Sequence, residues 1–96
     1  MIEHPTFQRQ AAKIWSEEEL HAFIDWIAVN PLAGDVIPEA EGARKVRWTV
    51  KGRGKSGGAR VIYFNFTDEG VIELFAVYVK VERENMSAAE IKKRRT

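Results

Sequence analysis

The chain has 96 residues, no cysteine, a formal net charge of +1 and 45% hydrophobic residues. This length predicts one globular domain, residues 1–96, and the lack of cysteine excludes a disulfide framework or a thiolate metal site. No apolar run approaches the roughly 20 residues of a membrane span and no leader pattern opens the chain, so we expect a cytoplasmic protein without membrane contacts.

Charge is separated along the chain. Between residues 14 and 41 there is no Lys or Arg, and the seven acidic residues are Glu17, Glu18, Glu19, Asp25, Asp35, Glu39 and Glu41. Between residues 44 and 60 there is no acid, and the seven basic residues are Arg44, Lys45, Arg47, Lys51, Arg53, Lys55 and Arg60. We expect an acidic and a basic surface, and a polyanion is the natural partner of the basic one. The plainer alternative is a hairpin whose lysines only keep it soluble.

The N-terminal residues predict a short edge strand within residues 2–7 and a short helix over 6–13, capped by Thr6. A stronger helix signal begins at Ser16, because Glu19 completes a capping box with it. This helix ends at Asn30, since the residue before a proline avoids helical geometry. Its apolar stripe has the helical spacing i, i+3, i+4, i+7 and consists of Leu20, Phe23, Ile24 and Ile27.

Three strands are predicted after residue 43. Residues 44–50 alternate between an apolar face and a basic face that carries Lys45 and Arg47. In residues 59–67, Arg60 falls on the same face as Ile62, and residues 71–81 are apolar on both faces, which is typical of a buried central strand.

The connections complete a predicted α+β domain. A mobile, glycine-rich loop joins the first two strands, Asp68-Glu69-Gly70 forms a hairpin turn, and Ser87 caps a short C-terminal helix. We therefore expect two N-terminal helices packed on a small, three-stranded antiparallel sheet, followed by a short helix.

Two familiar kinds of site do not fit the sequence. Gly54-Lys55-Ser56 matches only the end of a phosphate-binding P-loop, because Thr49 stands where the first glycine belongs and a strand follows instead of a helix. His21 lies in a polar helical row with Glu17 and Asp25, without a third ligand at metal spacing. We therefore expect neither a nucleotide nor a metal cofactor.

Phosphate chemistry by cations remains open. RNA carries its own nucleophile, the 2′-hydroxyl, so cleavage needs removal of its proton, in-line geometry and cations that stabilise the phosphorane charge. A desolvated lysine near other cations can act as the base. Composition does not distinguish cleavage from simple binding.

Four segments, NPLAGDVIP, GARKVRW, GRGKSGGARVIYF and VYVKVEREN, resemble the HigB-like branch of the RelE/ParE toxins of type II toxin–antitoxin modules. The resemblance extends from Thr6 to about Glu90. It implies the RelE/ParE-like α+β fold and a metal-independent, ribosome-dependent mRNA endonuclease (mRNA interferase) that cleaves the messenger in the A site. It further implies two partners, the ribosome with its mRNA and a HigA-like, DNA-binding antitoxin.

The family's functional positions carry over in part. The resemblance implies catalytic roles for four cations, Lys45, Arg47, Arg60 and Lys80. We expect RNA or ribosome binding by a further five residues, Arg44, Lys51, Arg53, Lys55 and Tyr78. Val81 stands where RelE has its catalytic arginine, and Ser87 falls near the position of the late RelE tyrosine.

These two departures support a second hypothesis of a different class. The chain would then be a non-catalytic binder on the same fold, either a ParE-like gyrase inhibitor or a degenerate toxin that only binds its antitoxin. Codon-linked cuts in a messenger would support the nuclease, whereas an intact message with blocked supercoiling would support the gyrase inhibitor.

Overall fold

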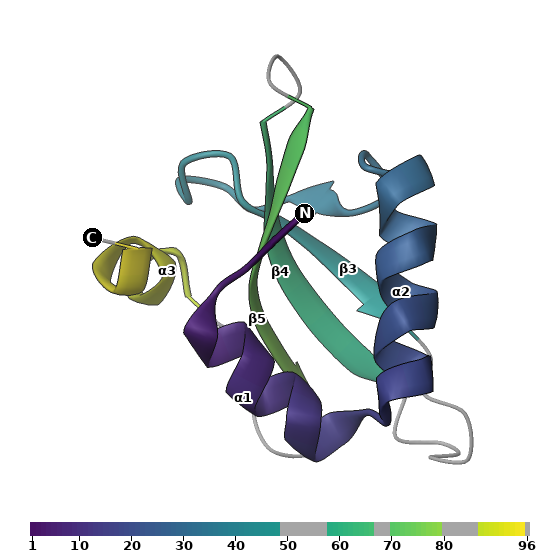
Figure 1. Cartoon of the computed structure of the whole chain (residues 1–96). Helices are drawn as coiled ribbons and strands as arrows, with labels where there is room; N and C mark the ends of the chain where they lie inside the picture. Colours follow the sequence, from purple (N-terminus) through teal and green to yellow (C-terminus); the bar gives the residue numbers. More distant parts are fainter. Residues whose placement is uncertain (49–57, 67–69, 80–86, 96) are drawn as a thin grey trace.

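The computed structural model describes residues 1–48, 58–66, 70–79 and 87–95. Within these residues, three helices and a five-stranded mixed sheet form an α+β fold (Figure 1). The helices are α1 (Pro5–Ile14), α2 (Glu17–Val29) and α3 (Ala88–Arg95). The strands are β1 (Ile2–Glu3), β2 (Asp35–Val36), β3 (Arg44–Trp48), β4 (Ala59–Phe66) and β5 (Val71–Val79), and they lie in the order β1-β5-β4-β3-β2.

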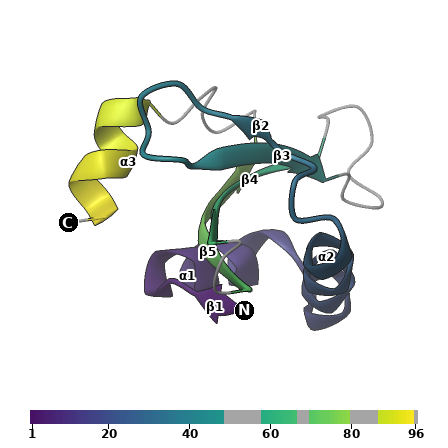
Figure 2. The same ribbon diagram turned by 90° about the horizontal axis from the view of Figure 1, so that it is seen from above.

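The sheet separates two apolar clusters. On one face α1 and α2 pack against alternate residues of β3, β4 and β5, including Val46, Val61 and Val77. On the other face a smaller cluster joins Ile62 and Tyr78 of the sheet to Ile91 of α3 and to the segment 37–43. Figure 2 shows α1 and α2 together on one side of the sheet and α3 apart from them.

The prediction for the second helix is confirmed. Ser16 Oγ accepts the Glu19 backbone N–H at 3.2 Å, and Glu19 Oε1 accepts the Ser16 N–H at 2.8 Å, which completes the capping box. Asn30 is the C-cap, and Phe23 and Ile27 are fully buried, as their spacing predicts. The row of Glu17, His21 and Asp25 is exposed, as expected.

The predicted start of the first helix is wrong. The helix begins at Pro5, and its cap is His4, whose Nδ1 accepts the Thr6 N–H at 3.4 Å. Proline suits the first helical position, because the N–H that it lacks has no partner within a helix there. The strand before it is limited to Ile2–Glu3.

The predicted antiparallel pairing is confirmed for β3, β4 and β5, but the whole sheet is larger than expected and mixed in direction. In the described residues β1 adds a parallel edge beside β5, and β2 adds an antiparallel edge beside β3. Strand β1 confirms the edge strand expected within residues 2–7, whereas β2, with two residues, is too short for an alternating pattern to be visible in the sequence. The prediction of a buried third strand is confirmed, because β5 lies between β1 and β4 and seven of its residues are buried. Only Val71 and Glu73 are partly exposed.

The short C-terminal helix is likewise confirmed, with Ser87 Oγ accepting the Glu90 N–H at 3.1 Å. The glycine-rich loop 51–57 and turn residues 68 and 69 lie outside the described residues. None of the helices that the structure does describe is long and apolar enough to cross a lipid bilayer.

Candidate nucleic-acid interface

Three predicted site residues meet in one row across the sheet. Arg47 of β3 is paired with Arg60 of β4, and Arg60 is paired with Tyr78 of β5. Directly opposed residues of antiparallel strands project from the same face with Cβ atoms about 4.5–5.5 Å apart. We call Arg47, Arg60 and Tyr78 the Arg60 row.

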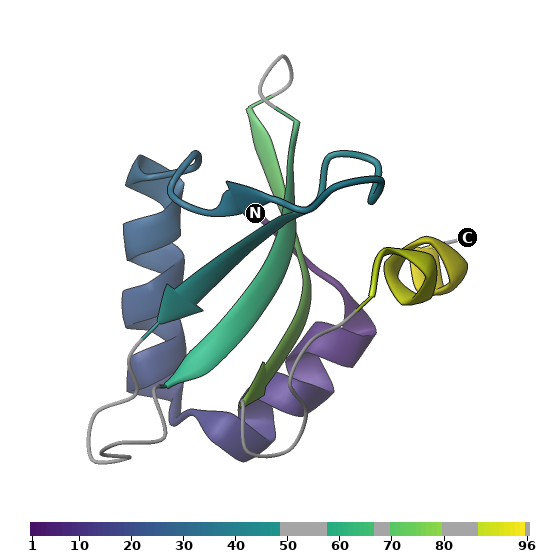
Figure 3. The ribbon, with the colours of Figure 1, turned by 180° about the vertical axis from the view of Figure 1, so that it is seen from behind.

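Lys45 lies beside this row on the same face. It is paired with Ile62, which is paired in turn with Ala76, so it belongs to the next row along the strands. Figure 3 views the sheet from the side opposite α1 and α2, where this face lies. Arg47 is exposed and Lys45 is half-buried, so both are accessible to solvent.

Arg60 differs from every other described cation in its burial. Its exposed fraction is 8%, and among the described residues it is the one charged side chain classed as buried. A buried charge acts through a lower effective dielectric than an exposed one, so its field on a neighbouring anion is stronger. The flanking Ile62 and Phe64 belong to the smaller apolar cluster, which places Arg60 at the border of a packed region.

Tyr78 is the β5 member of the Arg60 row. Its exposed fraction is 3%, and it packs in the cluster that contains Ile62, Ala76 and Ile91. In this position the ring supports the sheet beside Arg60 and is largely withdrawn from solvent.

Arg44 lies apart from the other predicted site residues. It is paired with Tyr63, on the face that α1 and α2 cover, and its Nη1 donates to the Gly34 carbonyl oxygen at 2.7 Å. The structure therefore places Arg44 beside the turn before β2 and not in the Arg60 row. Four further predicted residues, Lys51, Arg53, Lys55 and Lys80, lie outside the described residues, as does Val81.

A buried tyrosine that the sequence analysis did not single out holds the segment leading to β2 and β3. Tyr63 Oη accepts the Gly34 N–H and donates to the Pro31 carbonyl, both at 2.9 Å. Burial, the largest effect, raises the pKa of Tyr63, although the Gly34 hydrogen bond and the charge of Arg44 oppose the rise. A methyl group on Gly34 would lie 2.9 Å from the Lys45 carbonyl oxygen and from the Tyr63 ring, so only glycine fits there without a shift.

The acidic residues of α2 lie away from the site, whereas the exposed Asp35 of β2 is paired with Lys45 and shares its face. Glu17, Glu18 and Asp25 are exposed on α2, which packs on the sheet face opposite the Arg60 row. No group of three or more His, Cys, Asp or Glu residues suited to a metal ion occurs within the described part of the chain.

A comparison with models of known protein families finds none that matches this chain.

Proposed function

We propose that this chain is the toxin of a bacterial type II toxin–antitoxin module and acts as a ribosome-dependent mRNA endonuclease of the RelE/HigB kind. The observation that carries the proposal is the Arg60 row, in which a nearly buried guanidinium lies between an exposed arginine and a buried tyrosine. The sequence resemblance supplies the choice of RNA as the substrate and of the ribosome as the place of cleavage.

The reaction is an in-line displacement at phosphorus. The ribose 2′-oxygen forms a bond to the adjacent phosphorus atom while the bond from phosphorus to the 5′-oxygen of the next nucleotide breaks. A base removes the 2′-hydroxyl proton and an acid protonates the leaving oxygen. The products are a 2′,3′-cyclic phosphate and a 5′-hydroxyl.

Each cation near the row has a distinct part in this proposal. Arg60 stabilises the charge that develops on the equatorial phosphoryl oxygens, because its planar fork can donate two hydrogen bonds to one phosphate. Arg47 and Lys45 bind neighbouring phosphates of the messenger from more accessible positions. The role of the base falls to Lys80, which follows the last residue of β5 in the sequence.

An antitoxin would inhibit such a site by covering it. An acidic segment laid across Lys45, Arg47 and Arg60 neutralises the same charges that bind RNA. Its affinity is expected to decrease as salt rises, because exposed ion pairs are screened.

The test is cell-free translation of a defined messenger followed by primer extension. Cuts that appear only with ribosomes and that follow codon position support the nuclease. An intact messenger rejects it, and inhibition of DNA supercoiling by the same preparation would then identify a ParE-like gyrase inhibitor.

A further inference from the structure

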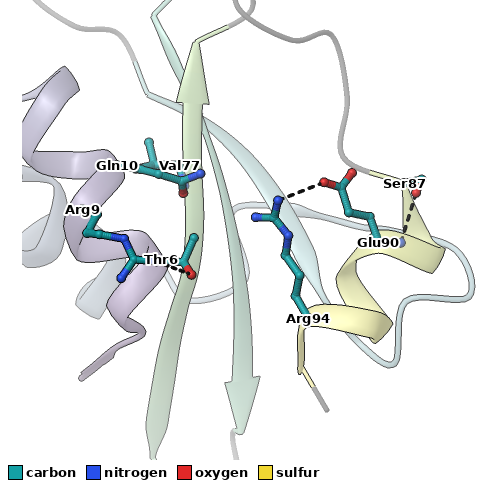
Figure 4. A network of polar contacts seen from close by, with 7 residues as sticks. All are labelled: Thr6, Arg9, Gln10, Val77, Ser87, Glu90 and Arg94. Carbon is teal, nitrogen blue, oxygen red and sulfur yellow. Dashed lines mark hydrogen bonds and ion pairs between the residues drawn. The ribbon is translucent and has the colours of Figure 1, made fainter.

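A second cationic site lies beside β5, and none of the Arg60 row residues is among its described lining residues. Helices α1 and α3 flank β5 there, with Thr6, Arg9 and Gln10 on one side and Arg94 on the other (Figure 4). A cavity of about 450 Å³ opens between them. Its described lining residues are His4, Thr6, Arg9, Gln10, Lys13 and Arg94, and we call it the α1–α3 pocket.

Two of the neutral lining residues have their acceptor atoms already engaged. Gln10 Oε1 accepts the Val77 N–H of β5 at 3.0 Å, so its amide NH₂ group is the part that remains to bind a ligand. His4 Nδ1 accepts the Thr6 N–H, so Nε2 carries the ring hydrogen. The neutral groups of the α1–α3 pocket therefore present mainly donors.

The charged lining residues are donors as well. Arg9, Lys13 and Arg94 are all cations, and none of the described lining residues is acidic. Glu90 offsets part of this charge from outside the lining, because its Oε2 lies 3.3 Å from Arg94 Nη2. Arg9 and Lys13 leave the α1–α3 pocket with a net positive charge.

We propose that the α1–α3 pocket binds a phosphate group, carried by a free nucleotide or by a polynucleotide backbone. A lining made mainly of donors suits a ligand that has several acceptor oxygens, and arginine forks match phosphate geometry. The cavity is also within the roughly 300–1,000 Å³ range of small-ligand sites. This inference does not depend on the proposed ribonuclease activity.

The first experiment is a titration of the ¹⁵N-labelled full chain with inorganic pyrophosphate, followed by NMR. We expect saturable shifts of the Gln10 side-chain amide and of the backbone amides of α1, with a Kd on the order of 1 mM, which is about −4 kcal/mol. Pyrophosphate also tests the Arg60 row, but the two sites are resolved because their signals come from different residues. Absence of saturable shifts in α1 up to about 10 mM overturns the proposal.

Paired variants distinguish a site from general charge attraction. Lys13→Gln should weaken the binding that Gln10 reports by about three- to tenfold, as expected for a partly solvated charge-assisted hydrogen bond. Lys92→Gln removes the same charge from an exposed position of α3 outside the α1–α3 pocket. This variant should change the Kd that the Gln10 amide reports by less than twofold. Equal losses from both variants would overturn the proposal.

Two more probes identify the source of the phosphate. Adenosine 5′-monophosphate offers a free phosphate monoester, and a short RNA with a 5′-hydroxyl offers only backbone diesters. Stronger shifts of the Gln10 amide with adenosine 5′-monophosphate identify a free nucleotide as the source of the phosphate. Stronger shifts with the RNA identify a polynucleotide backbone. Shifts with neither, despite binding of pyrophosphate, reject a nucleotide ligand.

Discussion

Tyr63 connects the sheet to the segment that leads into β2. Its hydroxyl is the hydrogen-bond partner of both Gly34 N–H and the Pro31 carbonyl. Tyr63→Phe removes both bonds and leaves the buried Gly34 N–H without its partner, whereas the Pro31 carbonyl keeps the Asn65 Nδ2 donor at 3.3 Å. We therefore expect a loss of about 1–3 kcal/mol in the free energy of unfolding. Urea denaturation measures this, and an unchanged midpoint would contradict the assigned contacts.

The same tyrosine predicts a dependence of stability on alkaline pH. Burial raises the pKa of Tyr63 in the folded protein, whereas an unfolded tyrosine titrates near about 10. Above that pH the unfolded chain loses the proton first, so the stabilisation is complete below about pH 10 and is lost as pH rises further. The difference in unfolding free energy between wild type and Tyr63→Phe should therefore decrease from pH 8 to pH 11. A constant difference would mean that the hydroxyl is not buried.

At the scale of single elements, the capping box fixes where α2 begins. Ser16→Ala removes the acceptor of the Glu19 N–H and should lower the unfolding free energy by about 1 kcal/mol. Ser16→Asn retains a side-chain acceptor at the cap and is the matched control, with an expected change of a few tenths of a kcal/mol. Equal losses from the two variants, measured by urea denaturation, would show that the cap contributes nothing specific.

Elements whose apolar residues repeat regularly over many positions could be predicted with their approximate bounds. The edge strand could be placed only within residues 2–7, and β2 was not predicted. Helix α2 and strands β3, β4 and β5 have the apolar spacing of their structures, and each was expected at its place. Strands β1 and β2 have two residues each, and their pairing depends on backbone contacts with β5 and β3. Helix α1 begins at Pro5, one residue earlier than predicted, because its N-cap is His4 and not Thr6.

The candidate site divides in the same way. The alternation of side chains along each strand predicts that Arg47 lies on a basic face and that Arg60 shares a face with Ile62. The pairing register between β3 and β4, which the sequence does not reveal, brings the two arginines opposite one another. Alternation also separates Arg44 from Lys45, although both were expected to meet RNA. Arg9 and Arg94 both line the α1–α3 pocket. No local sequence pattern relates two residues that are so far apart in the chain.

At the scale of the whole molecule, the acidic residues of α2 and the Arg60 row lie on opposite sides of the sheet, whereas Asp35 of β2 is paired with Lys45. Helix α2 presents Glu18 to solvent on the side away from the Arg60 row. Glu18→Gln should therefore leave growth arrest in cells nearly unchanged, as measured by colony counts after induction. A large loss of toxicity in a variant that still folds would place α2 in the functional surface.

The central claim is that Arg60 stabilises the transition state of RNA cleavage. The direct measurement is the single-turnover cleavage rate on programmed ribosomes at saturating protein, so that weaker binding does not affect the rate. Arg60→Ala should reduce this rate by roughly 10²–10³, the scale of losing one well-placed charge-stabilising donor. Arg60→Lys keeps the charge without the planar fork, so its cleavage rate should lie between those of the wild type and Arg60→Ala.

Lys92→Ala is the control for net charge, because Lys92 is exposed on α3 and lies outside the Arg60 row. Each variant is first checked for folding by circular dichroism, since Arg60 is nearly buried. The account predicts a wild-type rate for Lys92→Ala beside the large loss for Arg60→Ala. Equal, mild losses from Arg60→Ala and Lys92→Ala would contradict it, because Arg60 would then contribute only to binding.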